Sequence, residues 1–150
     1  MIWGADLGVR SVHLFCLDAP HTVKVDIPKM STRGLELRAL RYGLAEVIDH
    51  DMVFVEEPPL AGRRNIRTFA ALHQTYALVL SCTPEAYSVE VSTWKKEVVG
   101  KGNATKDEVS IWLNEQLPDY SALCGDDQNL ADAACIAVYG RAVLDRLRHQ

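Results

Sequence analysis

Three acidic residues lie in segments where acidic side chains are disfavoured. Asp6 is inside an apolar run, Glu56 ends another apolar run, and Asp132 is inside an alanine-rich stretch. Acids avoid such positions unless a partner or a ligand compensates their charge. If the fold brings the three together, a shared proton or divalent cations with oxygen ligands would relieve their repulsion. The trio predicts a metal centre, because two Mg²⁺ or Mn²⁺ ions about 4 Å apart suit phosphodiester hydrolysis.

Each of these acids also has an ordinary structural interpretation. Asp6 precedes Leu-Gly and could hold a turn. Glu56 could be a solvated acid at a strand end, beside Glu57, and Asp132 could be an exposed helical residue. Residue types and spacing alone leave both interpretations open.

Positive charge is concentrated in two segments, although the net charge of the chain is −4. Residues 95–106 contain one acid and four lysines, Lys95, Lys96, Lys101 and Lys106. The second segment contains three arginines, Arg63, Arg64 and Arg67. A glycine-containing loop that leads into a helix N-terminus suits phosphate, so the lysine segment predicts a local phosphate-binding surface. The alternative is a set of ordinary solvated cations.

Several other kinds of site are not indicated. The five histidines lack zinc-site spacing, and P-loop and dinucleotide glycine patterns are absent, which predicts no small-molecule cofactor. The four cysteines form no C-x-x-C pair and are expected to be reduced thiols in the cytoplasm of a bacterial cell. No secretion signal or long apolar span is present, which predicts no membrane role.

Hydrophobic periodicity predicts one α/β domain over residues 1–150. Short β-prone runs separated by turn residues predict five strands, over residues 1–8, 10–18, 21–27, 52–57 and 86–91. Apolar residues at helical spacing predict four helices, over residues 33–50, 65–82, 105–117 and 128–148. The first three strands should form an antiparallel meander within a five-stranded mixed sheet that also contains parallel strands.

Two of the predicted helices carry features that local stability does not explain. Lys106 lies in the first turn of its helix, where the helix dipole disfavours a cation, so a bound anion would account for it. Residues 65–82 are apolar on nearly every side, which predicts burial by more than one neighbour. A homodimer contact could supply the extra cover.

Four stretches of the chain resemble the RuvC family of Holliday-junction resolvases, in the RNase H-like superfamily. They are, in the family's order, GADLGVRS, VFVEEPPLAGRRNIRTFAALHQTYALV, TWKKEVVGKGNATKDEV and LADAACIAVYGR. The resemblance implies an RNase H-like fold in which Asp6, Glu56 and Asp132 bind Mg²⁺, with Mn²⁺ able to substitute. It further implies DNA-phosphate contacts near the scissile bond from Lys95 and Lys106. The short chain indicates a phage-type member, which would act in the host cell.

The chain departs from the family pattern at two positions. The family generally has Asp or His three residues before its last aspartate, where this chain has Asn129. An amide oxygen can ligate a metal but brings no charge, which predicts weaker metal binding or activity. Asp127 could assist if the helix begins late. Many relatives have a base-stacking aromatic three residues after their glutamate, where this chain has Pro59, with Leu60 as the nearest large apolar residue.

Two functions follow as hypotheses. The first is a metal-dependent endonuclease that nicks four-way junctions and related branched DNA, as a homodimer that makes paired cuts. The second is a junction-binding protein of the same fold with little or no catalysis, a hypothesis motivated by Asn129. In both cases the DNA-binding residues would be the cationic ones, Arg63, Arg64, Arg67, Lys95, Lys96, Lys101 and Lys106.

Overall fold

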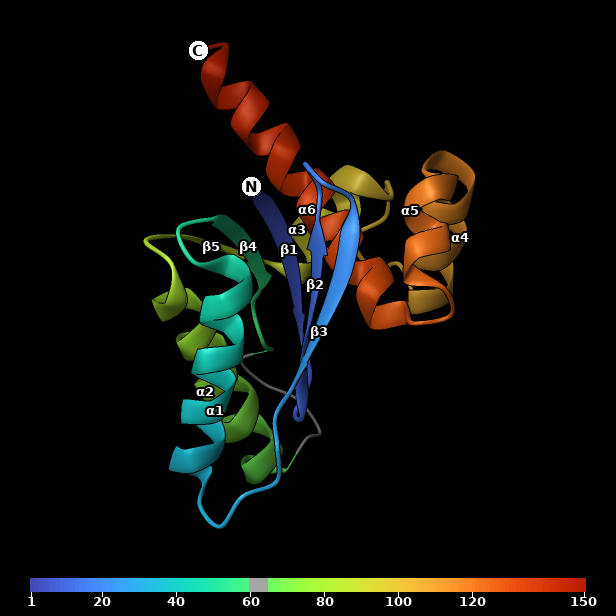
Figure 1. The fold of residues 1–150 in the computed structure, drawn as a ribbon. Helices are drawn as coiled ribbons and strands as arrows, with labels where there is room; N and C mark the ends of the chain where they lie inside the picture. Colours follow the sequence, from blue (N-terminus) through green and yellow to red (C-terminus); the bar gives the residue numbers. More distant parts are fainter. Residues whose placement is uncertain (60–64) are drawn as a thin grey trace.

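A mixed sheet of five strands forms the centre of the fold (Figure 1). The structure is a computed structural model and describes residues 1–59 and 65–150. The strands are β1 (Ile2–Leu7), β2 (Ser11–Cys16), β3 (His21–Asp26), β4 (Met52–Glu56) and β5 (Glu85–Val89). Their order is β3-β2-β1-β4-β5; β1, β2 and β3 are antiparallel neighbours, whereas β4 runs parallel to β1 and β5. The predicted fold class is confirmed.

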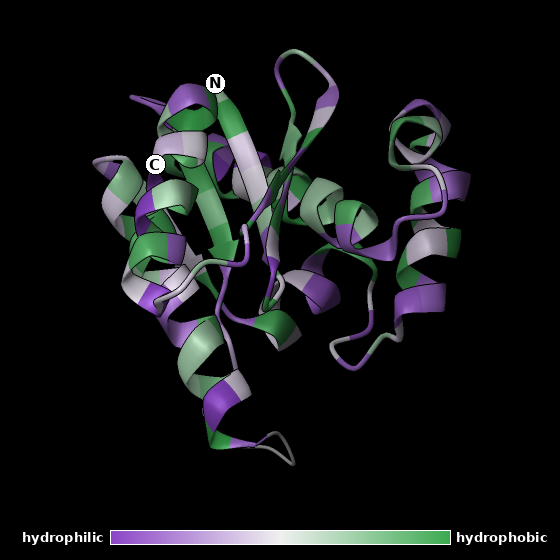
Figure 2. Ribbon diagram, turned by 60° about the horizontal axis from the view of Figure 1, so that its bottom comes forward, coloured by the Kyte–Doolittle hydropathy of each residue, from purple (hydrophilic) through white to green (hydrophobic). Residues whose placement is uncertain are grey.

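Helices cover both faces of this sheet (Figure 1). One face carries α1 (Arg33–Ile48) and α2 (Ile66–Cys82). The other carries α3 (Val91–Val98), α4 (Lys106–Gln116), α5 (Pro118–Cys124) and α6 (Gln128–Arg148). Hydrophobic residues follow the strands and the helix faces that meet them (Figure 2). None of the helices in the described residues is long and apolar enough to cross a membrane.

Side chains of β1 alternate between the two layers, because successive residues of a strand point to opposite faces. Trp3 and Ala5 belong to the core beneath α1 and α2. Gly4 lies on the opposite face, where a Cβ atom would approach the carbonyl oxygen of Ala133 in α6 to 1.9 Å. Glycine at this position therefore allows α6 to lie directly on β1, on the face to which Asp6 also belongs.

Local capping explains where several helices begin. Thr32 accepts a hydrogen bond from the Leu35 amide at the start of α1. Thr105 and Glu108 form the predicted capping box at the start of α4. These side chains satisfy backbone N–H groups that lack partners within the helix.

Two helices were not predicted from the sequence. Lys95 and Lys96, which we expected in a loop, lie on α3. This helix has eight residues and no side-chain cap, so its local signal is weak. The seven-residue α5 begins at Pro118, the residue that we expected to follow the end of a helix. Proline also fits the first turn of a helix, where its missing N–H is not needed.

The apolar helix α2 is less buried than we predicted. Within the described chain, its buried residues are Leu72, Thr75 and Val79, which form one face. Ile66, on another face, is 81% exposed. The helix does contact more than one neighbour, as predicted, since it packs against α1 and the sheet, but these neighbours leave the Ile66 side uncovered in the single chain.

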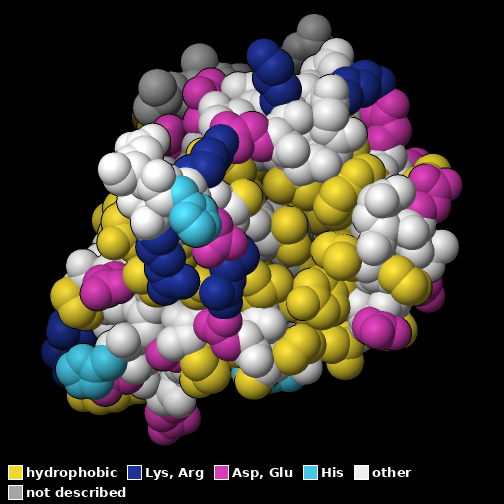
Figure 3. Space-filling model, turned by 90° about the horizontal axis from the view of Figure 1, so that it is seen from above, with side chains coloured by type: hydrophobic (Ala, Val, Ile, Leu, Met, Phe, Trp, Pro, Cys, Tyr) yellow, Lys and Arg dark blue, Asp and Glu magenta, His cyan; other side chains and the backbone are white. Residues whose placement is uncertain are grey.

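The surface at the end of the sheet away from Asp6 is divided by side-chain type. Figure 3 shows hydrophobic side chains gathered on one part of it and charged groups and histidines over the rest. A hollow of about 350 Å³ is lined by Leu17, Leu117, Tyr120, Val138 and Arg141. Arg141 is ion-paired with Asp18. The four cysteines are free, as predicted.

Candidate active site

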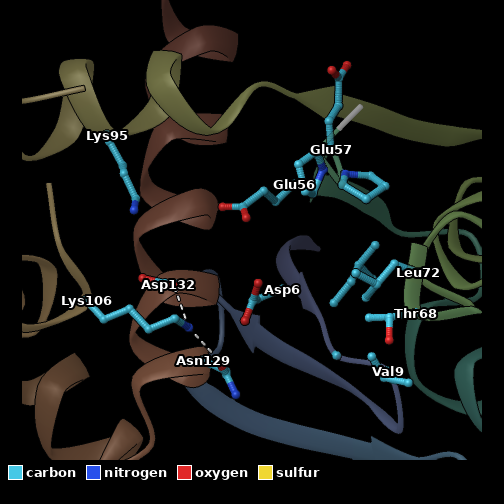
Figure 4. A pocket seen from close by; sticks show the side chains of 14 residues that line it. Asp6, Val9, Glu56, Glu57, Thr68, Leu72, Lys95, Lys106, Asn129 and Asp132 are labelled. Carbon is cyan, nitrogen blue, oxygen red and sulfur yellow. Dashed lines mark hydrogen bonds and ion pairs between the residues drawn. The ribbon is translucent and has the colours of Figure 1, made fainter. Parts of the chain in front are cut away.

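The three acids line one cavity of about 400 Å³ at the carboxyl ends of β1 and β4 (Figure 4). Asp6 is near the end of β1, and Glu56 ends the neighbouring parallel strand β4. Asp132 reaches the same cavity from α6, which packs across β1 and β2. The structure thus brings together side chains that are separated by 50 and by 76 residues of sequence.

Burial and mutual repulsion weaken the acidity of these carboxyl groups. Burial, together with the nearby carboxylates of Glu56 and Asp132, raises the pKa of Asp6 to about 8. Burial also raises the pKa of Glu56 and that of Asp132. Lys106 partly opposes the rise at all three. A group of acids with raised pKa values in a cleft is typical of a functional site.

Lys106 lies between the acids and Asn129. Its Nζ atom donates to the Asn129 Oδ1 atom at 2.6 Å and is 3.1 Å from the Asp132 Oδ2 atom. Burial lowers the pKa of Lys106, but Asp132 and the other carboxylates outweigh this effect and raise it overall. The ammonium group is therefore held as a cation at the acidic wall of the cavity.

Glu56 is oriented by a residue that we did not predict to be functional. The indole Nε1 atom of the fully buried Trp94 donates to the Glu56 Oε2 atom at 2.8 Å. Lys95, next along α3, lines the cavity; its Nζ atom donates to the Ala104 carbonyl oxygen at 2.8 Å. In the sequence, the only sign of a functional role for Trp94 is its position beside two lysines, and this does not indicate what the indole contacts.

Three further predicted cations, Lys96, Lys101 and Arg67, are not among the described residues that line the cavity. Lys101 forms an ion pair with Glu108 at 2.5 Å, and Lys96 and Arg67 are exposed. Arg63, Arg64 and Leu60 lie outside the described residues.

Asp127 also does not line the cavity. Its Oδ1 atom accepts hydrogen bonds from the amides of Asn129 and Leu130, so it is the N-cap of α6. Asp127 could have joined the acids only if the helix began later in the sequence. The helix begins at Gln128, and Asp127 stabilises its first turn.

Apolar residues also line the cavity. They are Leu7, Val9, Pro58, Pro59 and Leu72. Figure 4 shows Val9, Thr68 and Leu72 across the space from Lys106, while Glu57 points away from it. The cavity therefore offers one charged wall and one hydrophobic wall.

The donor atoms suit a hard divalent cation. Asp132 Oδ1 is buried and has no hydrogen-bond partner among the described residues, and Asp6 and Glu56 supply further oxygen atoms. A cation would remove the repulsion that raises the pKa of Asp6. Within residues 1–59 and 65–150, no three Asp, Glu, His or Cys side chains already stand close enough to enclose one ion.

Comparisons with known proteins identify the fold. No protein-family model and no curated protein matches the chain. Among solved structures, one of Thermus thermophilus RuvC matches with a TM-score of 0.67 and 20% identity, over 94% of this chain and 95% of that one. Another, of T. thermophilus RuvC in complex with a Holliday junction substrate, matches with a TM-score of 0.72 and 22% identity, over 94% of both chains. The chain therefore has the fold of the RuvC Holliday-junction resolvases.

Proposed function

We propose that the protein is a metal-dependent endonuclease that resolves four-way junctions and related branched DNA. The observation that carries this proposal is the cavity in which Asp6, Glu56 and Asp132 meet beside Lys95 and Lys106. Three hard-oxygen acids next to two cations suit the hydrolysis of a phosphodiester, which needs both a charged centre and phosphate-binding groups.

Asp6, Glu56 and Asp132, with the amide oxygen of Asn129, are the residues that would hold Mg²⁺ or Mn²⁺. Two such ions would supply positive charge at the phosphate and lower the pKa of an attacking water. The acids must be deprotonated for this role, and the raised pKa of Asp6 means that its proton is released when the cation binds.

The two lysines of the cavity would position the phosphate. An ammonium group has three donors, and Lys106 directs two of them to Asn129 and Asp132. The remaining donor can reach a phosphate oxygen while the other two keep the side chain in place. Lys95 is fixed in a similar way by the Ala104 carbonyl and lies against Trp94, with Nζ 5.5 Å from the ring centroid.

A symmetric dimer would present two such sites to the two equivalent strands of a junction. The exposed side of α2 supports this arrangement. Ile66, Phe69, Ala70, His73 and Ala77 recur at helical spacing there, away from the buried face of the helix. The same side carries the Phe69 and His73 rings, whose centroids are 4.2 Å apart. An apolar helix face of this kind is typical of an isologous contact.

Selectivity for junctions is supported by the fold. T. thermophilus RuvC has been solved in complex with a Holliday junction substrate, and the present chain matches that structure over 94% of both chains. We extend this ligand class to the present chain because its cavity and cationic side chains occupy a single end of the sheet.

The test compares the wild-type protein with the Asp6→Asn variant on an end-labelled four-way junction and on a linear duplex of the same sequence. We expect paired nicks in the junction with Mg²⁺ or Mn²⁺, few in the duplex, and none with the variant. An Asp6→Asn variant that cuts as well as the wild type would contradict the assignment of the acids.

A second candidate function is junction binding without cutting. Asn129 favours it, because this residue accepts a hydrogen bond from Lys106 where a carboxylate would add charge to the centre. Tight binding of the junction by the wild-type protein, with no nicks in either metal, would select this function.

A further inference from the structure

A buried histidine lies beside the cavity and takes no part in the chemistry described above. His13 is in β2, directly opposite Asp6 in the antiparallel pair, so both side chains lie on the face of the sheet that α6 covers. The residue is 3% exposed. Its Nδ1 atom has no hydrogen-bond partner among the described residues.

The other ring nitrogen of His13 faces the cap of α6. The His13 Nε2 atom is 3.6 Å from the Asp127 Oδ2 atom. The Oδ1 atom of the same carboxylate accepts from the amides of Asn129, at 2.9 Å, and Leu130, at 3.2 Å. One carboxylate therefore joins β2 to the first turn of α6.

The surroundings of the ring indicate its protonation state. Burial lowers the pKa of His13 more than the Asp127 carboxylate raises it. The neutral imidazole is therefore favoured. A neutral ring with its hydrogen on Nε2 directs that hydrogen toward Asp127 and leaves Nδ1 as a bare acceptor. In this tautomer the Asp127 carboxylate, at 3.6 Å, is the acceptor that Nε2 faces, whereas Nδ1 remains without a partner among the described residues.

Packing alone does not explain a histidine at this place. A buried nitrogen without a partner destabilises a fold, and an apolar side chain of similar size would avoid that cost. Asp6 is across the strand pair from His13, and Asp132 lies one helical turn after Asn129 in the helix that Asp127 caps. The contact thus lies between α6, which carries Asp132, and β2, the strand that pairs with the Asp6 strand β1.

We propose that His13 is a positioning residue that holds the Asp127 cap and thereby sets Asn129 and Asp132 at the correct distance from Asp6 for cation binding. This inference rests on the proposed function, since it assigns the His13–Asp127 contact a role in the metal affinity of the same site.

Two nearly isosteric variants test it. The amide nitrogen of His13→Gln can reach the place of Nε2, whereas that of His13→Asn reaches only the place of Nδ1. Mn²⁺ affinity is measured by calorimetry without DNA, junction affinity in EDTA, and the melting temperature in EDTA. We expect His13→Asn to lower the Mn²⁺ affinity roughly tenfold, as loss of a residue supporting metal ligands does, and His13→Gln to restore most of it. Junction affinity in EDTA should stay the same.

Equal Mn²⁺ affinities for the Asn variant and the wild type would overturn the role of His13. Equal losses in the Gln and Asn variants would also overturn it, because a purely steric role does not distinguish them.

If His13→Asn does not fold, the Asp127→Ser variant tests the proposal instead. Serine caps a helix but has no second oxygen for His13, so an unchanged Mn²⁺ affinity would refute the proposal. A wild-type protein that neither binds Mn²⁺ nor nicks junctions would overturn the nuclease function together with this inference, whereas unaffected variants of an active protein would overturn this inference alone.

Discussion

At the scale of single residues, the carboxyl group of Asp6 makes the fold sensitive to pH. Its pKa is raised from 3.8 to about 8 by burial and by two neighbouring acids. Between these values the folded protein keeps a proton that the unfolded chain releases, so the free energy of unfolding decreases as the pH rises. Without a cation, the protein should therefore become less stable from about pH 4 to about pH 8.

Asp6→Asn should remove this loss of stability. We expect the variant to melt at least about 3 °C above the wild type in EDTA at pH 8, because one kcal/mol corresponds to about 2–4 °C in a domain of this size. The difference should shrink toward pH 5, where the wild-type carboxyl is protonated. Calorimetric scans in EDTA at several pH values measure it. A variant less stable than the wild type at pH 8 would show that Asp6 is not held under repulsion.

Lys106→Ala should weaken junction binding and lower the dependence of the logarithm of the affinity on the logarithm of the salt concentration by about one unit, the effect of one lost phosphate contact. Lys101→Ala is the matched comparison, since Lys101 is paired with Glu108 and lies outside the cavity. We predict a smaller change for it. Titrations of labelled junction at several salt concentrations give both slopes. An unchanged slope for Lys106→Ala would remove this residue from the phosphate-binding groups.

Trp94→Phe should lower the nicking rate roughly tenfold, because Glu56 loses the donor that orients it. The free energy of unfolding should fall by about 1–3 kcal/mol, since a buried acceptor loses its partner. Trp112→Phe, at a half-buried position on α4, controls for the loss of an indole. Single-turnover nicking and urea denaturation measure the two effects. Equal rates in both variants would argue against an orienting role for Trp94.

At the scale of elements, the contact between β1 and α6 determines whether the centre forms. A Cβ atom at position 4 would lie 1.9 Å from the Ala133 carbonyl oxygen and 2.5 Å from the Ala137 nitrogen. These are backbone atoms, so the helix as a whole would have to move. Asp132 moves with the helix, and its distance from Asp6 would grow.

Gly4→Ala should therefore destabilise the protein by about 3 kcal/mol and reduce nicking more than the lost stability explains. Gly34→Ala is the control, because a Cβ atom there would meet only the Thr32 hydroxyl, at 3.9 Å, and alanine favours a helix. Urea denaturation and nicking by the folded fraction test the pair. A Gly4→Ala variant with wild-type nicking would show that the centre tolerates displacement of α6.

The sequence predicted the elements that have strong local signals. All five strands, the capped helix α4 and the long helix α6 follow from periodicity and caps. The helix α3 was missed because packing of Trp94, and not a cap, stabilises it. The three acids that line the cavity could be singled out because each is an exception in an apolar segment, whereas the contacts of Trp94 and His13 depend on tertiary structure that spacing does not encode.

At the scale of the whole molecule, the exposed side of α2 is the surface through which the proposed dimer would bring two centres together. We predict that Ala70→Glu converts a dimer to monomers, because a two-fold contact would bring the two introduced charges close together. Ile111→Glu, at an exposed position of α4, should leave the assembly unchanged. Sedimentation velocity distinguishes the two states. A wild-type protein that is monomeric at micromolar concentration would exclude this interface.

Ala70→Glu should also uncouple the two cuts. A monomer can still nick one strand of a junction, so we expect single nicks to accumulate while paired nicks disappear. A cruciform in a supercoiled plasmid separates the two products, since one nick relaxes the plasmid and paired nicks make it linear. Linear product at the wild-type rate would show that paired cutting does not need this surface.

The order of the elements along the chain has a consequence for protein synthesis. Asp6 and Glu56 belong to strands, whereas Asp132 arrives on α6, which follows every strand in the sequence. A ribosome produces the chain from its N-terminus, so the first two acids are folded or folding while the third is still being translated. A nascent polypeptide therefore cannot complete this centre until its last helix has emerged and docked.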